Sequence, residues 1–340
     1  MKIAVLPGDG IGPEVMRACL TVLQSLVRDL RFEEGGIGLE CHSRTGEYMP
    51  QETLALVKES DAVLFGAITT PKDRHYVSPL LLLRWELELY ANVRPAYCLH
   101  PSVCVKPLDV VIVRENTEGL YTRIEREEAG KVITERSVSE TACKRIIEFA
   151  FRYAVAHRRK KVTCVHKANV LRLSDGMFLN LFYGAAVNYA YRYKISSNDH
   201  HVDAAAMRLV KEPESLDVLV TLNMYGDILS DEAAGLVGGL GVAPSGNFGD
   251  RYALFEPVHG SAPEIAGKGI ANPTGMILSA AMMLGHLGMG EEAGRVEKAV
   301  RQVITSGIRT PDIGGSASTM EFAAAVAAEV ENPSTEPREE

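Results

Sequence analysis

The chain has 340 residues, more than the roughly 250 at which a single hydrophobic core usually stops growing, so two domains or one elaborated α/β unit are expected. Hydrophobic residues make up 46% of the sequence and charged residues 24%, which is typical of globular proteins and excludes a collagen-like or disordered chain. The formal net charge of -8 argues against a general binder of nucleic acid or of anionic membranes. Any site for an anion must therefore be built locally.

The cysteines and the N-terminus indicate a reducing compartment. The six cysteines include no CxxC pair, and no histidine stands at zinc-ligand spacing, so buried free thiols are expected rather than a disulfide framework. The N-terminal apolar run ends at Pro7-Gly8 and is too short for the core of a signal peptide. No apolar stretch approaches the ~20 residues that cross a bilayer. We therefore expect a cytoplasmic protein without a membrane segment.

Short apolar, β-branched runs alternate with amphipathic stretches along the chain. The apolar runs predict buried strands at residues 3–6, 62–65, 110–113, 162–165 and 218–221. The amphipathic stretches predict helices at residues 14–29, 79–90, 140–157, 175–191 and 227–236. This alternation predicts an α/β fold whose largely parallel sheet is covered on both faces.

Three segments depart from the alternation. Residues 118–137 place charged side chains around Gly130, which fits an exposed antiparallel hairpin, either simply solvated or clasping a second subunit. The Gly-rich residues 235–249 predict a loop between domains. Residues 332–340 carry Pro, Ser and charge without apolar periodicity and predict a disordered tail.

The motif Gly-Asp-Gly-Ile-Gly-Pro at residues 8–13 lies where a dinucleotide-binding fingerprint would lie, between a predicted strand and a predicted helix. Pro13 occupies the place of the third glycine that the fingerprint needs, and no acidic residue ends a second strand at the right distance. A tight turn with Pro13 at the first helical position is therefore favoured over a phosphate-binding loop.

Two acids, Asp227 and Asp231, are four residues apart and would share one face of a helix. Carboxylates one turn apart repel each other unless a cation lies between them, so a divalent-metal site and a solvated acidic face are both open readings. Asp203 is a third acid, at the end of a predicted strand. Ligands that are all oxygen would favour Mg²⁺ or Mn²⁺ over zinc.

Three arginines, Arg84, Arg94 and Arg114, are each flanked by residues that should be buried. Buried charges need partners, and guanidinium groups match carboxylates bidentately. Converging arginines would bind a di- or tricarboxylate, while three structural salt bridges are an equal alternative.

Further candidates are Lys167, which follows a buried strand and could act as a base, and Tyr121, which could give a proton. A loop around Gly260 carries Glu264, an acid placed to accept ribose hydroxyls. Each of these signals is weak by itself.

Together these segments resemble the β-decarboxylating dehydrogenases, the family of isopropylmalate, homoisocitrate and isocitrate dehydrogenases. The resemblance covers nearly the whole chain, from residues 6–14 to residues 310–315. Its specific blocks are residues 90–95, 113–121, 166–170, 226–231 and 256–263. It implies an α/β fold in two domains with a mixed sheet, not a Rossmann fold.

The resemblance also implies how the two domains divide the work. Residues 1–89 plus 239–340 would form a cofactor-side domain that contains both termini. Residues 90–238 would form the substrate, metal and dimerisation domain, with a clasp hairpin near residues 118–138.

By the same resemblance, two chains share each active site. Three arginines would hold the two malate carboxylates and three acids would bind Mg²⁺ or Mn²⁺, namely Arg84, Arg94, Arg114, Asp203, Asp227 and Asp231. Asp203 and Lys167 would come from the partner subunit. This arrangement implies an obligate homodimer, with a tetramer of two dimers left open.

The implied reaction suits these residues. Lys167 of the partner subunit would remove the C2 hydroxyl proton while a hydride passes to the nicotinamide. The β-carboxylate would then leave as CO₂ with the metal holding the enolate charge, and Tyr121 would protonate the resulting carbon.

The resemblance implies NAD as the cofactor. Its contacts would be Ile11, Thr69, Asn169, Glu256, His259, Gly260, Ser261, Ala262, Glu264, Ile265 and Asn272. NADP-dependent relatives carry Lys-Tyr where this chain has Glu264-Ile265. A carboxylate at Glu264 would accept both ribose hydroxyls and repel a 2′-phosphate.

The third substituent of the malate would be read by the helical turn before Arg84. Ser78 matches a serine of isocitrate enzymes, but Leu80 stands where they carry asparagine, and Leu81 stands where one type of homoisocitrate enzyme carries arginine. Two leucines suit an isopropyl group, because a buried carboxylate without a polar partner is costly. The expected substrate is 3-isopropylmalate, in leucine synthesis.

Alternatives remain close. The Tyr-x-Ser-Pro pattern at residues 76–79 also resembles archaeal enzymes that act on homoisocitrate and its longer homologues, and isocitrate stays open. A non-catalytic regulatory subunit is disfavoured because the arginines, the acids, Tyr121 and Lys167 are all present. A metal-binding scaffold is disfavoured further, since it would need neither the arginines nor Lys167.

Overall fold

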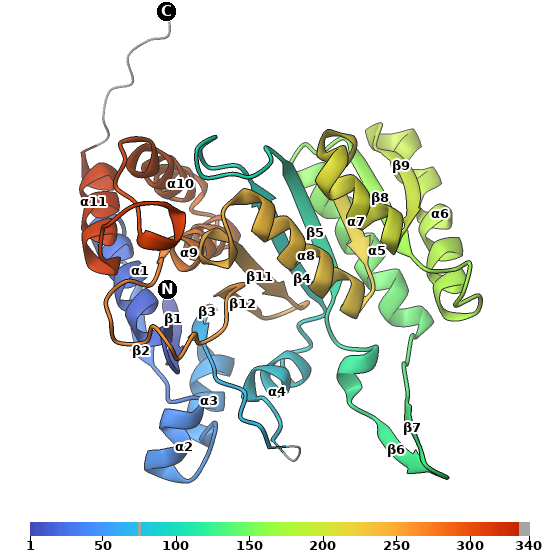
Figure 1. Ribbon diagram of the computed structural model, residues 1–340, viewed down its shortest axis with the longest axis horizontal. Helices are drawn as coiled ribbons and strands as arrows, with labels where there is room; N and C mark the ends of the chain where they lie inside the picture. The colour runs from blue at the N-terminus through green and yellow to red at the C-terminus, as the bar shows by residue number, and fades with distance from the viewer. Residues whose placement is uncertain (74–75, 333–340) are drawn as a thin grey trace, which may run out of the picture.

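Strands from both ends of the chain and from its middle meet in one large sheet. The computed structural model describes residues 1–73 and 76–332 and contains a 10-stranded sheet in the order β2-β1-β3-β12-β11-β4-β5-β10-β8-β9, with a separate hairpin of β6 and β7 (Figure 1). The strands are β1 (Lys2–Gly8), β2 (Arg31–Glu34), β3 (Ala62–Ala67), β4 (Ala91–Tyr97), β5 (Asp109–Glu115), β6 (Glu125–Glu128), β7 (Lys131–Thr134), β8 (Lys161–His166), β9 (Ser196–His201), β10 (Val218–Thr221), β11 (Pro244–Phe248) and β12 (Ala253–Pro257).

Helices fill the connections between these strands. They are α1 (Gly12–Leu26), α2 (Leu39–Thr45), α3 (Gln51–Glu59), α4 (Pro79–Glu86), α5 (Glu140–Ala156), α6 (Ser174–Tyr193), α7 (Val202–Lys211), α8 (Asn223–Val237), α9 (Thr274–His286), α10 (Gly290–Thr305) and α11 (Thr319–Glu331), with short 3₁₀ turns η1 (Leu120–Thr122), η2 (Pro213–Ser215), η3 (Leu240–Val242) and η4 (Pro311–Ile313). All five predicted helices and all five predicted strands are present. The predicted helix at residues 79–90 ends early, at Glu86, because Glu88 adopts a left-handed φ of 49°.

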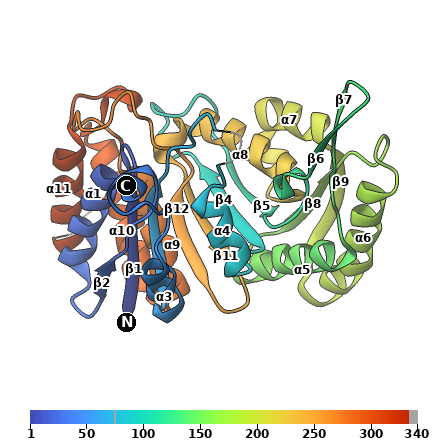
Figure 2. The same cartoon turned by 90° about the horizontal axis from the view of Figure 1, so that it is seen from below.

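The sheet is mixed. The outer pairs on both sides are parallel, whereas β12-β11, β11-β4 and β4-β5 in the middle are antiparallel. Helices cover both faces, as Figure 2 shows for the strands β5 and β8, which have α7 and α8 on one side and α5 and α6 on the other. The predicted α/β class with a mixed sheet is confirmed.

The sheet order separates the chain into two halves. β1 to β3 from the N-terminal part lie beside β11 and β12 from the C-terminal part, and the strands from the middle of the chain form the other half. The halves meet where β11 pairs with β4, with Gly246 opposite Val93; we call this pairing the seam. We keep the two-domain division at residues 89/90 and 238/239 as our interpretation of this order.

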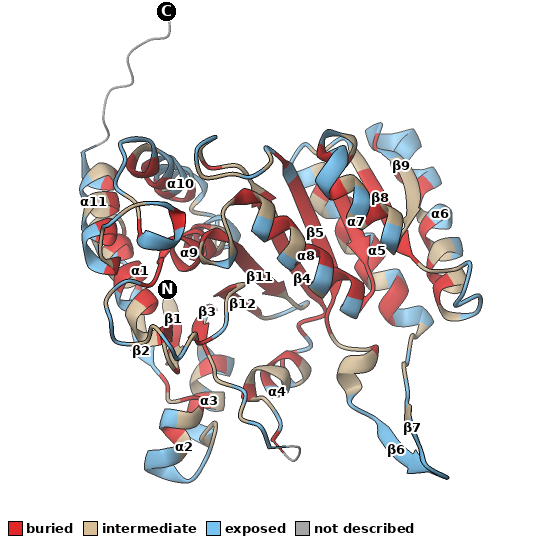
Figure 3. Cartoon of the chain, in the orientation of Figure 1, coloured by how far each residue is buried: buried red, intermediate tan, exposed pale blue. Residues whose placement is uncertain are grey.

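Buried apolar strands hold the layers together. Every residue of β3 is buried, as its continuous apolar run predicts for a strand covered on both faces, and Figure 3 shows the same burial along the central strands. The hairpin β6-β7 is mostly exposed and projects from the body. The predicted hairpin is therefore present, with Glu125 opposite Thr134 and Glu128 opposite Lys131.

The predicted interdomain loop at residues 235–249 is present but shorter, because only residues 238–243 connect α8 to β11. α8 runs to Val237, and β11 occupies the middle of the sheet. Gly238 and Gly239, with φ of 128° and 102°, begin this connection, and η3 follows them. Gly246 instead serves close packing, because a Cβ there would approach the Phe248 ring to 2.9 Å.

The prediction of six free thiols is also wrong in part. Cys98 and Cys104 form a disulfide, with Cα atoms 5.8 Å apart, because the chain turns at His100, whose carbonyl accepts hydrogen bonds from Val103 and Cys104. The other four cysteines are buried and free. Among the described helices, none has the length and apolar character needed to cross a membrane. Apart from Asn332, the predicted disordered tail lies outside the described residues.

Candidate active site

Two predicted arginines meet one predicted acid beside the seam. Arg114, at the end of β5, forms an ion pair through Nη1 with Oδ1 of Asp227, and Nη1 of Arg94 on β4 lies 3.3 Å from the same oxygen. Arg94 Nη1 is also 3.4 Å from Asp231 Oδ1. Asp227 and Asp231 share one face of α8, as their spacing predicted.

The arginines at this point are buried. Arg114 is only 1% exposed, and burial together with neighbouring Arg94 lowers the pKa of Arg114 to about 10. Asn223 orients its guanidinium, accepting from Nε at 3.0 Å and from Nη2 at 2.8 Å. Strand β5 therefore delivers a cation that is desolvated and rigidly aimed, which strengthens its attraction for an anion.

The two acids of α8 differ in their electrostatics. Burial alone would raise the pKa of Asp227, but Arg114 and Arg94 hold this pKa below its ordinary value. At Asp231 burial raises the pKa, and the charges of Arg94 and Arg114 do not offset it. A further cation near Asp231 would stabilise its ionised form.

Tyr121 lies in the 3₁₀ turn η1 and donates a hydrogen bond through its hydroxyl to Oδ2 of Asp227. The Arg114 guanidinium carbon is 4.9 Å from the centroid of its ring, within the range of a cation–π contact. Burial raises the pKa of Tyr121, so the hydroxyl keeps its proton at neutral pH. The structure therefore brings Tyr121 to the arginines and Asp227.

Arg84 lies on the other side of the seam. Its Nη2 is 2.9 Å from Oε1 of Glu256 on β12, and both side chains are buried. Asn247 on β11 donates to the same carboxylate oxygen at 2.8 Å. Nε of Arg84 is buried and has no hydrogen-bond partner within the described residues. The resemblance placed Glu256 among the cofactor contacts; the structure joins it to an expected substrate residue.

Lys167 and Asp203 form a second group. Lys167 follows β8, Asp203 lies in the first turn of α7 rather than at a strand end, and the ammonium forms an ion pair with Oδ1 of the acid. The Asp203 side chain is 67% exposed. Over the residues that the structure describes, no three His, Cys, Asp or Glu side chains of this chain come together as a metal site. One chain therefore does not bring Asp203 to Asp227 and Asp231.

Asp175 holds the backbone of Lys167 and was not among the predicted site residues. It is completely buried and accepts from the Lys167 amide at 2.7 Å and from the Tyr225 hydroxyl at 3.0 Å. Arg136, which follows the hairpin, is 2.7 Å from its other oxygen. Three segments distant in sequence thus meet at one carboxylate.

Replacing Asp175 by Ala is expected to lower the free energy of unfolding by about 3–5 kcal/mol, because it leaves Arg136 and the Tyr225 hydroxyl without their buried partner. Urea or guanidinium denaturation would measure the loss. The matched control is Glu140→Ala, which removes an acid from the exposed pair with Lys144 and should change stability little. Equal stability of the two variants would contradict the role of Asp175.

The predicted turn at residues 8–13 packs against the loop that carries the expected cofactor residues. Ile11 N donates to the Ser261 carbonyl at 2.8 Å, and the Thr69 hydroxyl is 2.7 Å from the Ser261 hydroxyl. Gly10 has φ of 61°, and a Cβ there would lie 2.0 Å from the Ser261 oxygen, so only glycine fits. The predicted tight turn is present, but α1 begins at Gly12, so Pro13 is its second residue rather than its first.

His259 marks the same loop as a binding surface. Burial lowers the pKa of His259 and favours its neutral form. Its Nδ1 is 2.9 Å from the Gly260 carbonyl oxygen, while Nε2 is buried without a partner in residues 1–73 and 76–332. A buried nitrogen of this kind fits a polar group of a bound molecule.

The remaining expected cofactor residues are placed unevenly. Asn272 is buried and donates to Asp312 at 3.0 Å. Ala262 is half-buried with a left-handed φ of 37°. Further along the same loop Ile265 is half-buried and Glu264 is exposed. Asn169 is exposed and lies close to Lys167 in the sequence.

The expected specificity residues lie at the start of α4. Ser78 is its N-cap, Leu80 is half-buried against the apolar cluster around Leu83, and Leu81 is half-buried. Their helix also carries Arg84, so a ligand held by Arg84 would lie within reach of this turn.

Comparison with known proteins identifies the group to which this architecture belongs. The family model described as isocitrate/isopropylmalate dehydrogenase matches residues 2–326. The chain belongs to the isocitrate/isopropylmalate dehydrogenase family. The predictions of family, fold class and enzyme type, a decarboxylating dehydrogenase, are confirmed. This family depends on nicotinamide dinucleotides and divalent metal ions and acts on carboxylates.

Similar members differ in the substrates that their names state. The 3-isopropylmalate dehydrogenase of Methanothermobacter thermautotrophicus is 49% identical over 333 residues, covering 98% of this chain and 99% of that protein. The homoisocitrate dehydrogenase of Methanocaldococcus jannaschii is 47% identical over 333 residues, covering 94% of both. The crystal structure of isocitrate dehydrogenase from Methylococcus capsulatus has a TM-score of 0.93 at 43% identity and covers 97% of this chain and 99% of that one.

The residues of this dehydrogenase fit the two groups that its family uses. For a divalent cation, Asp227 and Asp231 offer carboxylate oxygens, the donors that Mg²⁺ and Mn²⁺ prefer, and their side chains are 36% and 54% exposed. A dinucleotide would find polar groups where the loop of residues 259–265 meets Thr69. These are the unpartnered Nε2 of His259 and the hydroxyls of Thr69 and Ser261.

Several polar residues that complete the site gave no signal in the sequence. Asn223 orients Arg114, Ser230 accepts from Arg94 Nη1 at 2.8 Å, and Asn247 joins Glu256 to Asn92. Asn247 lies in the segment predicted as a loop, so the sequence did not predict that its side chain points to the site. Recognising residues 244–248 as a buried strand would have predicted this direction.

Proposed function

We propose that this dehydrogenase catalyses the NAD- and Mg²⁺- or Mn²⁺-dependent oxidative decarboxylation of a 3-substituted malate, with 3-isopropylmalate as the first candidate. The observation that carries the proposal is the convergence of Arg94, Arg114 and Tyr121 on Asp227. Two desolvated guanidiniums and a protonated phenol around one carboxylate match the needs of a substrate that loses CO₂ and then accepts a proton.

Each residue has a defined task in this proposal. Arg94 and Arg114 bind the malate carboxylates, and Arg84, held by Glu256, binds from across the seam. Lys167 of a second subunit takes the proton of the C2 hydroxyl, and Tyr121 returns a proton to the carbon that the carboxylate leaves. When bound, the dinucleotide accepts the hydride and the cation withdraws charge from the substrate oxygen.

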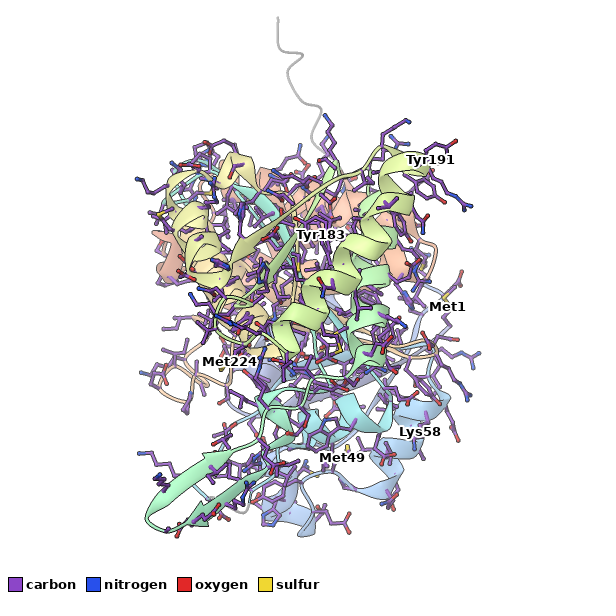
Figure 4. All side chains as sticks on the ribbon, turned by 90° about the vertical axis from the view of Figure 1, so that its right-hand side faces the viewer. Met1, Met49, Lys58, Tyr183, Tyr191 and Met224 are labelled. Carbon is purple, nitrogen blue, oxygen red and sulfur yellow. A yellow bond between two sulfur atoms is a disulfide. The ribbon has the colours of Figure 1, made fainter. Side chains whose placement is uncertain are left out.

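The surface around Lys167 supports a site shared between two chains. Exposed apolar side chains gather on α6, α7 and α8, including Val187, Tyr191, Met207, Met224 and Ile228. Figure 4 shows Tyr183, Tyr191 and Met224 on this side of the molecule. An exposed apolar surface of this kind favours association. We propose a homodimer in which this surface is buried and Lys167 and Asp203 reach the partner's Asp227.

The substrate is tested by following NADH formation with Mg²⁺ and comparing kcat/KM for 3-isopropylmalate, homoisocitrate and isocitrate. Half-buried Leu80 and Leu81 offer an apolar wall, so 3-isopropylmalate should be preferred by about a hundredfold. A preference for a tricarboxylate would reject the apolar-wall interpretation. Absence of turnover with all three would reject the proposed function.

A tricarboxylate is the second candidate, because of Arg123. Its Nη1 donates to the Tyr76 carbonyl at 2.6 Å, which places a guanidinium beside the segment that leads into α4. A third carboxylate near Ser78 would find a cation there. In the assay above, Arg123→Gln would lower kcat/KM for homoisocitrate far more than for 3-isopropylmalate if this candidate is correct.

The cofactor proposal rests on Glu264, whose exposed carboxylate would accept ribose hydroxyls. Replacing Glu264-Ile265 by Lys-Tyr is expected to shift the ratio of kcat/KM for NADP to that for NAD by at least about tenfold, since a hydrogen bond to a charged group is worth roughly 1.5–3 kcal/mol. Steady-state kinetics with both dinucleotides would measure the shift. Glu291→Lys on α10 adds the same charge elsewhere and should leave the ratio unchanged.

A further inference from the structure

A cavity lies on the side of the seam opposite to the candidate active site. It has a volume of about 720 Å³ and is walled by α5, α9, α10, β4 and β11. This volume is in the range of small-molecule sites, which favour boundaries between domains. None of the residues assigned to catalysis, metal or cofactor above lines it.

Strand alternation places this cavity back to back with the active site. On β4, Asn92 and Arg94 point to the site, whereas Pro95 and Tyr97 line the cavity. On β11, Asn247 points to the site, whereas Phe248 lines the cavity. Successive side chains of a strand point to opposite faces, so the two strands of the seam are a common wall.

Aromatic rings cross the seam inside the cavity. Ring centroids lie 6.1 Å apart between Tyr90 and Phe149, 5.6 Å apart between Phe149 and Phe248, and 5.6 Å apart between Phe248 and His286. Phe149 belongs to α5 and Phe248 to β11, so the row joins the two halves of the sheet. A flat apolar body would find a surface along this row.

Four lysine, arginine, aspartate or glutamate side chains line the cavity, and one of them is an arginine that forms no ion pair within the described residues. Arg159 is engaged by Asp109 at 2.7 Å and by Asp217 at 3.2 Å, and Asp250 accepts from the Tyr90 hydroxyl at 3.3 Å. Glu297 lies near Arg301. Arg152 interacts with the Tyr90 hydroxyl and, in the described part of the chain, forms no ion pair.

We propose that this cavity is a second binding site, for a small amphipathic carboxylate whose carboxylate pairs with Arg152 and whose apolar body packs along the aromatic row. Occupancy changes the affinity of the catalytic site. Phe248 contacts the ligand, and its neighbour Asn247 holds Glu256 and thereby Arg84. A displacement of one residue in β11 is therefore transmitted to a substrate-binding arginine.

Binding is tested by calorimetry with 3-phenylpropionate and its uncharged amide. This measurement needs no turnover, so its result does not depend on which substrate the enzyme uses. The acid should bind one equivalent per chain, and the amide at least about tenfold more weakly, because a charged hydrogen bond is lost. The Arg152→Gln variant should bind the acid only as weakly as the wild type binds the amide. Gly285→Phe should abolish binding, since a Cβ there meets no atom within 4 Å and the ring would fill the cavity.

The matched control is Lys144→Gln, which removes an exposed cation from the same helix outside the cavity and should bind like the wild type. Equal binding by wild type and Arg152→Gln, or no binding by the wild type, would overturn the proposal. In the activity assay, the substrate KM should rise with the concentration of the acid and level off at about five times its starting value, as coupling between two sites requires. An increase that continues linearly means competition at the catalytic site and also overturns it.

Discussion

Replacing Tyr121 by Phe is expected to lower kcat by at least about a hundredfold while the substrate KM changes by no more than a few-fold, since positioned general acids contribute roughly 10²–10⁴ in rate. The ring remains under the Arg114 guanidinium, 4.9 Å from its centroid, so binding by the arginines is preserved. Only the hydroxyl that donates to Asp227 is removed. An interaction made only in the transition state is lost in kcat rather than in KM.

Steady-state kinetics on the preferred substrate would measure this effect. The matched control is Tyr189→Phe, which removes a hydroxyl that donates to Glu148 on α5, away from the arginines, and should retain wild-type turnover. Unchanged turnover of Tyr121→Phe would remove Tyr121 from the mechanism. A raised KM with unchanged kcat would make it a binding residue instead.

Mixing two inactive variants should restore activity if each site is built from two chains. Lys167→Ala and Tyr121→Phe should each lose at least about a hundredfold in kcat as separate dimers. After joint refolding, each mixed dimer would have one site with both lesions and one site with neither. A random mixture would then recover about one quarter of the wild-type activity.

The structure explains why this experiment is decisive. Within one chain Lys167 pairs with Asp203, whereas Tyr121 bonds to Asp227, and no contact joins the two groups among the described residues. If both residues served the site of their own chain, every site in a mixed dimer would carry one lesion and nothing would recover. Mixing the variants without unfolding is the control for subunit exchange.

The local elements follow directly from the sequence. β3 is a continuous apolar run, and such a run can be stable only when covered on both faces. The spacing of Asp227 and Asp231 predicts a shared helical face, and the arginines between apolar neighbours predict buried cations that need anions. These inferences depend on short-range periodicity and on the free-energy cost of burying a charge. Both can be judged from residues that are near each other in the sequence.

Long-range partners were not predictable in the same way. Nothing in the sequence showed that Gly246 and Asn247 belong to a central strand, because glycine-rich segments are usually turns. In the structure, close packing against the Phe248 ring requires the glycine. The Cys98–Cys104 disulfide depends on a turn at His100 that no cysteine spacing rule describes. The resemblance named Glu256 as a cofactor contact, but its pairing with Arg84 appears only when β12 lies beside the seam.

The sequence by itself thus determined the α/β class, the family through its ordered motifs, and the chemical types at the candidate site. Only the tertiary structure decided which residues meet: Arg94, Arg114 and Tyr121 at Asp227, and Lys167 with Asp203 in a separate exposed group. The physical reason is that periodicity and charge burial act over a few residues, whereas these contacts depend on which strands become neighbours in the sheet.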